Sequence, residues 1–265
     1  MKKILIPVLL TVLYACNSKQ EDPKIATTQK ETPAAKASEK KSEKIAVDYE
    51  TSAYDDPKIA DRVSEQKENL KELSEKKVFL DIHTKLLQKL PKEQQSFFLT
   101  NTDYEVLSIA KGSLFEENSN DFAFIVYDKK KVRISIVLYN GITSKYAKLY
   151  EDIKVVNGVK DEDSGNYSFG TSDYQFAYEH LIYNKDYLEK STGTYLESSN
   201  LKITDISKDE DFVLDHGTFA KNVSKTNLAH TLCIATSSVY SNWDCFRYDK
   251  TKHTFILFYS QAFAD

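Results

Sequence analysis

A long stretch near the amino terminus, from Asn17 to about Asp56, contains almost no large apolar residue. Lys, Glu, Thr, Ala, Ser and Pro dominate it, so it cannot bury enough apolar surface to offset the entropy of ordering. We therefore expect residues 16–56 to form a disordered tether, with a reach of about 35 Å. The remainder of the 265-residue chain is long enough for one ordinary hydrophobic core.

The residues before this stretch combine a positive start with a short apolar run. Lys2 and Lys3 precede the run Ile4–Leu13, which is too short to span a membrane as an ordinary helix. Ala15 then places a small side chain directly before Cys16. This arrangement resembles the lipobox family of signal peptides, which are cleaved before a cysteine that carries diacylglycerol. The resemblance implies a signal peptide over residues 1–15 and a membrane anchor through lipid on Cys16; the alternative is an uncleaved anchor helix.

The residues after Cys16 predict the membrane to which the lipoprotein would be sorted. In the enteric sorting scheme, an aspartate directly after the lipidated cysteine resembles an inner-membrane retention signal. This chain has Asn17 there, so we expect it to be sorted to the outer membrane. Lys19–Asp22 resembles the lysine-plus-acidic tags that export some lipoproteins to the cell surface, and an acidic linker has the same composition. The expected location is an outer-membrane lipid anchor, with the folded part periplasmic or surface-exposed.

Helical periodicity runs from Asp61 to Leu90 and ends at Pro91. It predicts one or two amphipathic helices in a segment over residues 57–92. Their apolar faces are expected to pack on the domain that follows rather than to form a groove for a partner. The two apolar stripes contain Val63, Leu70 and Leu73, and then Phe79, Ile82, Leu86 and Leu90.

Residues 93–265 show the alternation and turn signals of β-strands. Lys129–Lys131 and Asn140-Gly141 separate apolar runs as turns do, which predicts an antiparallel meander. The predicted strands are Phe122–Tyr127, Val132–Tyr139, Tyr146–Val156, Tyr174–Tyr178, Gly193–Glu197, Leu201–Ile206, Phe212–Leu214, Ala229–Thr236, Trp243–Tyr248 and His253–Tyr259. The expected fold class is mainly β, α+β overall, with antiparallel meander sheets of sandwich or partial-propeller type after one or two amphipathic helices.

Two cysteines remain once Cys16 carries lipid. Cys233 and Cys245 lie in consecutive predicted strands, so hairpin pairing can bring them near the separation that a disulfide needs. An oxidising compartment favours that bond. The spacing is not the CxxC of a catalytic dithiol, and two cysteines without paired histidines leave a zinc shell incomplete. We predict a structural disulfide between Cys233 and Cys245.

The segment from Gly112 to Val126 resembles a degenerate FG-GAP or VCBS-like repeat, a loop rich in aspartate that precedes a strand. Gly112 and Asp121 match that pattern, whereas Ser113 replaces its first aspartate and Asn118 its loop glycine. In that family the loop binds calcium through carboxylate oxygens. Related periplasmic proteins include inhibitors of peptidoglycan-cleaving enzymes and immunity proteins against toxins.

Other polar and aromatic groups give no complete site. Asp161–Asn166 and Asp209–Asp211 are acidic turns without the full calcium-loop spacing. The histidines are scattered, and although Asp215 and His216 could join a distant serine, nothing in the sequence selects a triad. Residues of one further segment could form an aromatic patch, although alternation places two of them in the core: Tyr240, Trp243, Phe246 and Tyr248. No catalytic, cofactor-binding or metal site is predicted.

The charge balance limits the partners. Lys and Arg number 36 against 40 acidic residues, for a net charge of -4, so no basic field would attract nucleic acid. The leading hypothesis is a membrane-anchored envelope lipoprotein that binds an envelope protein without catalysis, as an inhibitor or immunity protein against a cell-wall hydrolase or toxin. The alternative is an envelope hydrolase or a glycan-handling surface lipoprotein, which requires a pocket where histidine and carboxylates converge.

Overall fold

The computed structural model describes residues 47, 49–52, 55, 57, 60–159, 189–220, 223, 228–235 and 242–261. Several predictions from the sequence lie outside these residues: the signal peptide, Cys16, most of the tether, the strand at Tyr174–Tyr178 and the acidic turn at Asp161–Asn166.

The described chain from residue 60 to residue 100 forms α1 (Ala60–Ser74), α2 (Lys77–Lys89) and α3 (Lys92–Thr100). Leu70 and Leu73 of α1 and the apolar stripe of α2 are buried, as their periodicity predicts, and pack in the same core as the strands that follow, whereas the side chain of Val63 lies outside the described part. Helix α3 departs from the prediction that the β domain begins at residue 93. Pro91 caps its first turn with φ −61°, which suits a helix start, and Gln94 and Phe98 bury one face at helical spacing.

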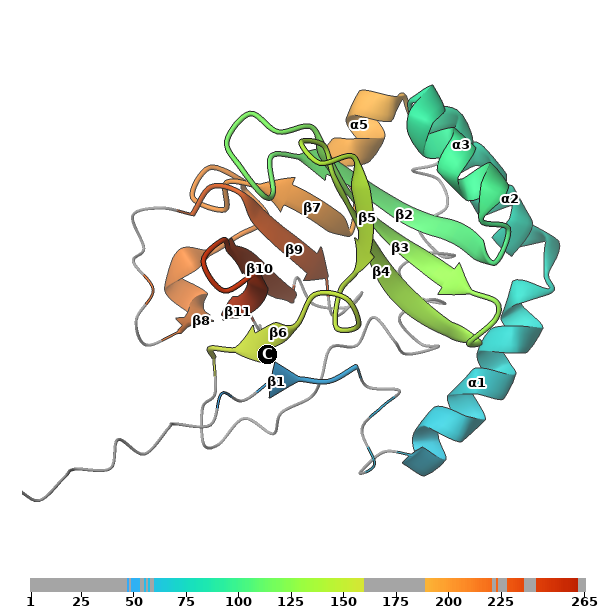
Figure 1. Ribbon diagram of the computed structural model, residues 1–265, viewed down its shortest axis with the longest axis horizontal. Helices are drawn as coiled ribbons and strands as arrows, with labels where there is room; N and C mark the ends of the chain where they lie inside the picture. Colours follow the sequence, from blue (N-terminus) through green and yellow to red (C-terminus); the bar gives the residue numbers. More distant parts are fainter. Residues whose placement is uncertain are drawn as a thin grey trace, which may run out of the picture. The chain divides into compact units, whose positions relative to one another are not determined.

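The strands form two sheets (Figure 1). The small sheet is antiparallel in the order β2-β3-β4-β5, with bounds Tyr104–Gly112 (β2), Asp121–Asp128 (β3), Arg133–Asn140 (β4) and Lys145–Lys148 (β5). The large sheet has the order β1-β6-β11-β10-β9-β7, and β8 also pairs with β11. Its strands are Tyr49–Glu50 (β1), Val155–Asn157 (β6), Leu201–Thr204 (β7), Gly217–Phe219 (β8), Thr231–Ala235 (β9), Trp243–Asp249 (β10) and Thr254–Gln261 (β11).

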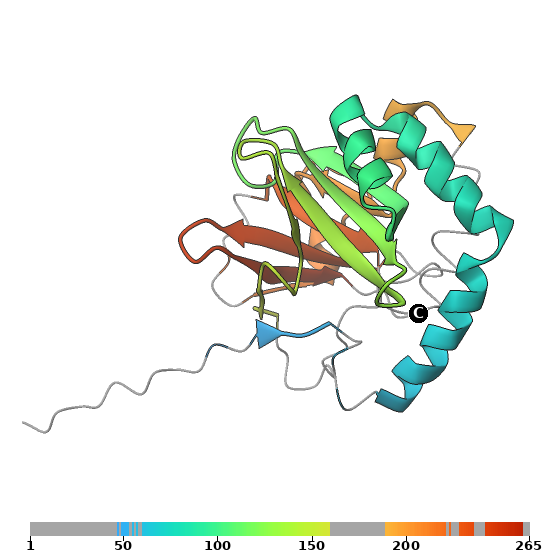
Figure 2. The same cartoon turned by 45° about the vertical axis from the view of Figure 1, so that its right-hand side comes forward.

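A shared hydrophobic core joins the helices to both sheets. Every residue of β3 is buried, because α2 and α3 lie beside the small sheet and the large sheet also packs against it (Figures 1 and 2). Phe98 of α3 meets Phe124 edge-on, with ring centroids 4.9 Å apart. Side chains of the helices and of the strands therefore bury one another. The mainly β, α+β fold class is confirmed.

A second, smaller core lies on the other face of the large sheet. Alternation along β9 directs Leu232 and Ile234 into the shared core, and Cys233 and Ala235 into the second one. Trp243 and Phe258 complete this second core together with the cysteine pair. The two faces of β9 are thus both covered, which explains its continuous apolar sequence.

Several strand predictions need correction. Gly193–Glu197 belongs to helix α5 (Thr192–Glu197), because the Ser191 hydroxyl accepts a hydrogen bond from the Thr194 amide and caps the first turn. Phe212–Leu214 forms no strand; a turn closes there with Phe212 N donating to Asp209 O, and the 3-10 helix η6 (Leu214–His216) follows. Tyr146–Val156 is interrupted between β5 and β6, where Tyr150 adopts φ 71°.

The topology also differs from a pure antiparallel meander. Strands β11 and β6 pair in parallel, with Phe255 opposite Val155. Strands β1, β2 and β8 have no counterpart among the predicted strands. Strand β1 lies within the predicted disordered tether and forms there because its backbone pairs with β6. Since β8 is three residues long and pairs only at the end of β11, its short local sequence carries little strand signal.

Candidate functional site

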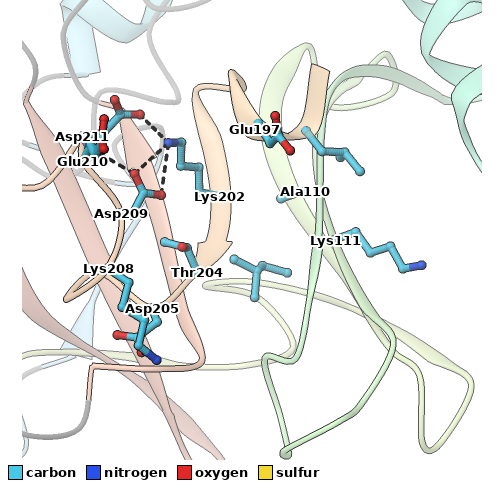
Figure 3. Close-up of a pocket in the computed structure, with 12 residues that line it drawn as sticks. Ala110, Lys111, Glu197, Lys202, Thr204, Asp205, Lys208, Asp209, Glu210 and Asp211 are labelled. Carbon is cyan, nitrogen blue, oxygen red and sulfur yellow. Dashed lines mark hydrogen bonds and ion pairs between the residues drawn. The ribbon is translucent and has the colours of Figure 1, made fainter. Parts of the chain in front are cut away.

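A pocket of about 760 Å³ lies beside β7, which ends the strand order of the large sheet. Strand β7 contributes Lys202, Ile203 and Thr204, the end of β2 contributes Ala110 and Lys111, and helix α5 contributes Leu196 and Glu197 (Figure 3). The loop over residues 205–211 supplies the remaining wall. Two parts of the chain that are far apart in the sequence therefore meet at this pocket: the end of β2, and the stretch from α5 through β7 to residue 211.

Lys202 is the most buried charged group in the pocket wall, with its side chain 8% exposed. Its ammonium donates to both carboxylate oxygens of Asp209 at 3.1 Å and also to Asp211. The same ammonium lies 5.6 Å from the ring centroid of Trp243 and 6.0 Å from that of Phe212. These contacts compensate the desolvation of the charge and hold Lys202 in place.

The other charges of the pocket differ in how they are paired. Lys208 lies 2.9 Å from Asp205, and hydrogen bonds from Ser207, together with Lys208, lower the pKa of the Asp205 carboxyl. Within the described part of the chain, Glu197 and Glu210 are exposed and make no ion pair. In total five carboxylates and three ammonium groups line the pocket, so its lining is negative overall.

Asp121, the residue that best matches the calcium-loop pattern, has a different role. Its side chain is fully buried and accepts hydrogen bonds from the Leu114 and Phe115 amides at 2.7 and 2.8 Å and from the Gly141 amide at 2.8 Å. The Ser119 hydroxyl donates to it as well. These donors occupy both carboxylate oxygens, so Asp121 ties the loop before β3 to the turn after β4. The residues that the structure describes contain no group of three or more His, Cys, Asp or Glu arranged to hold a metal.

The described histidines make structural contacts at separate places. The Nδ1 atom of His83 accepts a hydrogen bond from the Val106 amide, and burial lowers the pKa of His83. His230 Nδ1 lies 2.8 Å from the Ser113 carbonyl oxygen, and His253 Nδ1 lies 3.0 Å from the Tyr248 hydroxyl. His216 and Asp215 are exposed in η6, and none of the histidines in the described ranges lines the pocket.

The cysteines at Cys233 and Cys245 are directly opposite one another on β9 and β10. Their sulfur atoms are at bonding distance, 2.01 Å, and their Cα atoms are 4.1 Å apart. Both side chains are fully buried in the second core. Of the suggested aromatic patch, Trp243 and Phe246 are buried, Tyr248 is half-buried, and Tyr240 lies outside the described residues.

A second group of charges surrounds Arg133 at the start of β4. Its guanidinium pairs with Glu151 and, at 3.1 Å, with Asp55, which precedes α1. Burial alone would raise the pKa of Glu151, but hydrogen bonds from Lys131 and Arg133 outweigh it and lower that pKa to about 2. The charges of this group are paired with one another, which suits a structural link rather than a site with spare capacity for a ligand.

Asp244 on β10 is the described carboxyl with the most unfavourable environment for its charge. Burial raises its pKa to about 6, the nearby charge of Glu50 on β1 acts in the same direction, and a 2.8 Å hydrogen bond from Ser260 opposes both. Asp244 does not line the pocket.

Sequence reasoning found one part of the pocket and missed the rest. The composition of Asp209–Asp211 predicts an acidic turn, without the spacing of a calcium loop. Its attachment to Lys202 and its position opposite Glu197 depend on how β7 and α5 fold back, which no local pattern encodes. The signal that could have pointed to a buried ion pair is Lys202, a lysine inside the predicted strand Leu201–Ile206.

Comparison with known proteins gives no relative: no protein-family description, curated protein or solved structure matches the chain. Among the described helices, none is both long enough and apolar enough to cross a membrane.

Proposed function

We propose that this chain is an envelope lipoprotein, anchored through lipid on Cys16, that binds an envelope protein without catalysing a reaction. The partner class that we propose is a cell-wall hydrolase or a toxin, which the protein would block. The lipobox resemblance and the apolar-poor stretch that follows Cys16 support the anchoring, since together they would hold the folded part away from the lipid surface.

The observation that carries the binding role is the open, charged pocket beside β7. Its buried ammonium, that of Lys202, is tied to Asp209 and Asp211 and is therefore poorly placed to act as a nucleophile or base. Glu197 and Glu210 are exposed, so they lack the desolvation that adjusts a general acid to neutral pH. The envelope-hydrolase alternative needs histidine and carboxylates in one pocket, and no described histidine lines this one.

The anchoring is tested by Cys16→Ser in the full chain. The variant should lose acylation and move from the membrane fraction to the soluble envelope fraction, as followed by fatty-acid labelling and fractionation. A variant that stays membrane-bound and keeps an uncleaved amino terminus would contradict the lipid anchor.

The binding role is tested by photocrosslinking in cells of the source organism. A photoreactive residue is placed at Glu210 in the pocket wall and, as a matched control, at Glu72 on the exposed side of α1. We expect a discrete adduct with one envelope protein at Glu210 and not at Glu72, and inhibition of that protein by the purified chain if it is a hydrolase or toxin. Identical adduct patterns at both positions, or none at Glu210, would refute a partner at this pocket.

A further inference from the structure

Apolar and charged side chains line the pocket beside β7 together. Leu196 of α5 and Ile203 of β7 are half-buried and supply the apolar surface, whereas Ala110 of β2 also lines the pocket but is almost fully buried. Figure 3 shows Glu197 on one side of the pocket and the Asp209–Asp211 turn on the other. A ligand that fills this space can therefore contact aliphatic side chains and carboxylates at once.

The positive groups of the pocket are already occupied. Lys202 donates to Asp209 and Asp211, and Lys208 pairs with Asp205. Lys111 lies over the ring of Phe122, with its ammonium 5.7 Å from the ring centroid, and points away from the Lys202 group (Figure 3). An anionic ligand would therefore compete with the existing carboxylate partners for the ammonium groups of Lys202 and Lys208.

The carboxylates of the pocket can still bind a further cation. Glu197 and Glu210 make no ion pair among the described residues, and Asp209 and Asp211 share the single ammonium of Lys202. The volume of about 760 Å³ exceeds the space that one side chain fills and suits a short segment of chain. The apolar side chains and the unpaired carboxylates of the pocket together match a ligand with an alkyl chain that ends in a positive charge.

We infer that this pocket receives lysine or arginine side chains of the protein partner, with their alkyl stems on Leu196 and Ile203 and their charges beside Glu197 and Glu210. This inference rests on the proposed binding function and specifies the chemistry that the pocket recognises. Binding of this kind weakens as salt rises, because the carboxylates involved are exposed.

The test uses the full chain, purified in detergent, and a capped pentapeptide with two lysines. Its twin carries norleucine in place of both lysines and keeps the alkyl stems without the charge. Isothermal titration calorimetry measures Kd directly, because Trp243, the only tryptophan of the chain, is buried in the second core and does not line the pocket.

We expect the lysine peptide to bind more tightly than its norleucine twin, and less tightly as ionic strength rises. Each exposed charge contact contributes modestly, so Glu197→Gln and Glu210→Gln should each raise Kd about two- to fivefold. Glu72→Gln, on the exposed surface of α1, should leave Kd unchanged. Both pocket glutamates are exposed, so neither variant is expected to affect folding.

Three results would overturn the inference: equal binding of the norleucine twin, pocket variants that bind like the Glu72→Gln control, or binding of spermidine without binding of the lysine peptide. The last result would assign the pocket to a free polyamine. If the crosslinking at Glu210 captures a partner but no lysine peptide binds, only this inference fails. If the lysine peptide binds but no envelope partner is captured, the proposed function fails and the cation preference stands.

Discussion

The disulfide between Cys233 and Cys245 offers the most quantitative test of how this fold is stabilised. The bond joins directly opposed residues of β9 and β10 and closes a short loop, with a sequence separation of 12. Replacing both cysteines by alanine removes the cross-link and leaves the remaining side chains of the second core in place. We expect the double variant to fold and to be less stable than the native chain.

The size of the loss follows from loop-closure entropy. For a loop of this length, the cross-link lowers the entropy of the unfolded chain by an amount that corresponds to about 3 kcal/mol at 25 °C. Both sulfur atoms are also fully buried, so alanine removes packing, and the total loss should lie between about 3 and 5 kcal/mol. For a domain of this size, the entropic part alone lowers Tm by about 6 to 12 °C.

Chemical denaturation of the native chain, both single variants and the double variant measures this free energy. Because either substitution breaks the bond, each single variant should lose nearly as much stability as the double variant, and the native chain should approach them after unfolding and refolding in reductant. Cys16→Ser is the control and should leave the unfolding free energy unchanged. Single and double variants that all remain within about 1 kcal/mol of the native chain would refute a stabilising disulfide.

Two further predictions concern buried carboxylates. Asp121→Ala should lower the unfolding free energy by about 3 kcal/mol or more, because the buried amide donors around it lose their acceptor. In the same denaturation assay, Asp103→Ala at an exposed position should lower it by less than about 0.5 kcal/mol. Equal losses would contradict the structural role of Asp121. The folded-state pKa of Asp244 is raised from 3.8 to about 6, so the folded state binds the Asp244 proton more tightly than the unfolded state does. The stability that this contributes is fully present below pH 4, and the unfolding free energy should fall by up to about 3 kcal/mol as the pH rises through 6. Asp244→Asn should flatten that dependence in unfolding curves at pH 4, 5, 6 and 7, and an unchanged slope would show that Asp244 is not its source.

Elements set by nearby residues were predictable from the sequence. Burial follows the predicted period at Leu70 and Leu73 of α1, along the apolar stripe of α2, and along the strand runs of β3, β4, β10 and β11. The cysteine pair was predictable for the same reason, since two consecutive strands joined by a short loop pair with each other.

Elements that depend on a capping residue or a distant strand were not predictable. Ser191 converts a strand-like sequence at Gly193–Glu197 into helix α5 by accepting the Thr194 amide. Strand β8 forms only because the end of β11 offers it a partner, and β6 pairs in parallel with β11 across a long stretch of chain. Propensity and spacing describe neither relation.

By itself, the sequence determined which segments lack the apolar residues for a core, which carry helix or strand periodicity, and which cysteines a hairpin would bring together. These properties depend on side chains within a few positions of one another. Tertiary structure alone decided that Asp121 is saturated by buried donors, that Lys202 is tied to Asp209 and Asp211, and that Glu197 stands across a pocket from Glu210. The physical reason is that a pocket and its unpaired charges arise from surfaces of β2, α5 and β7 that meet only after the two sheets have packed.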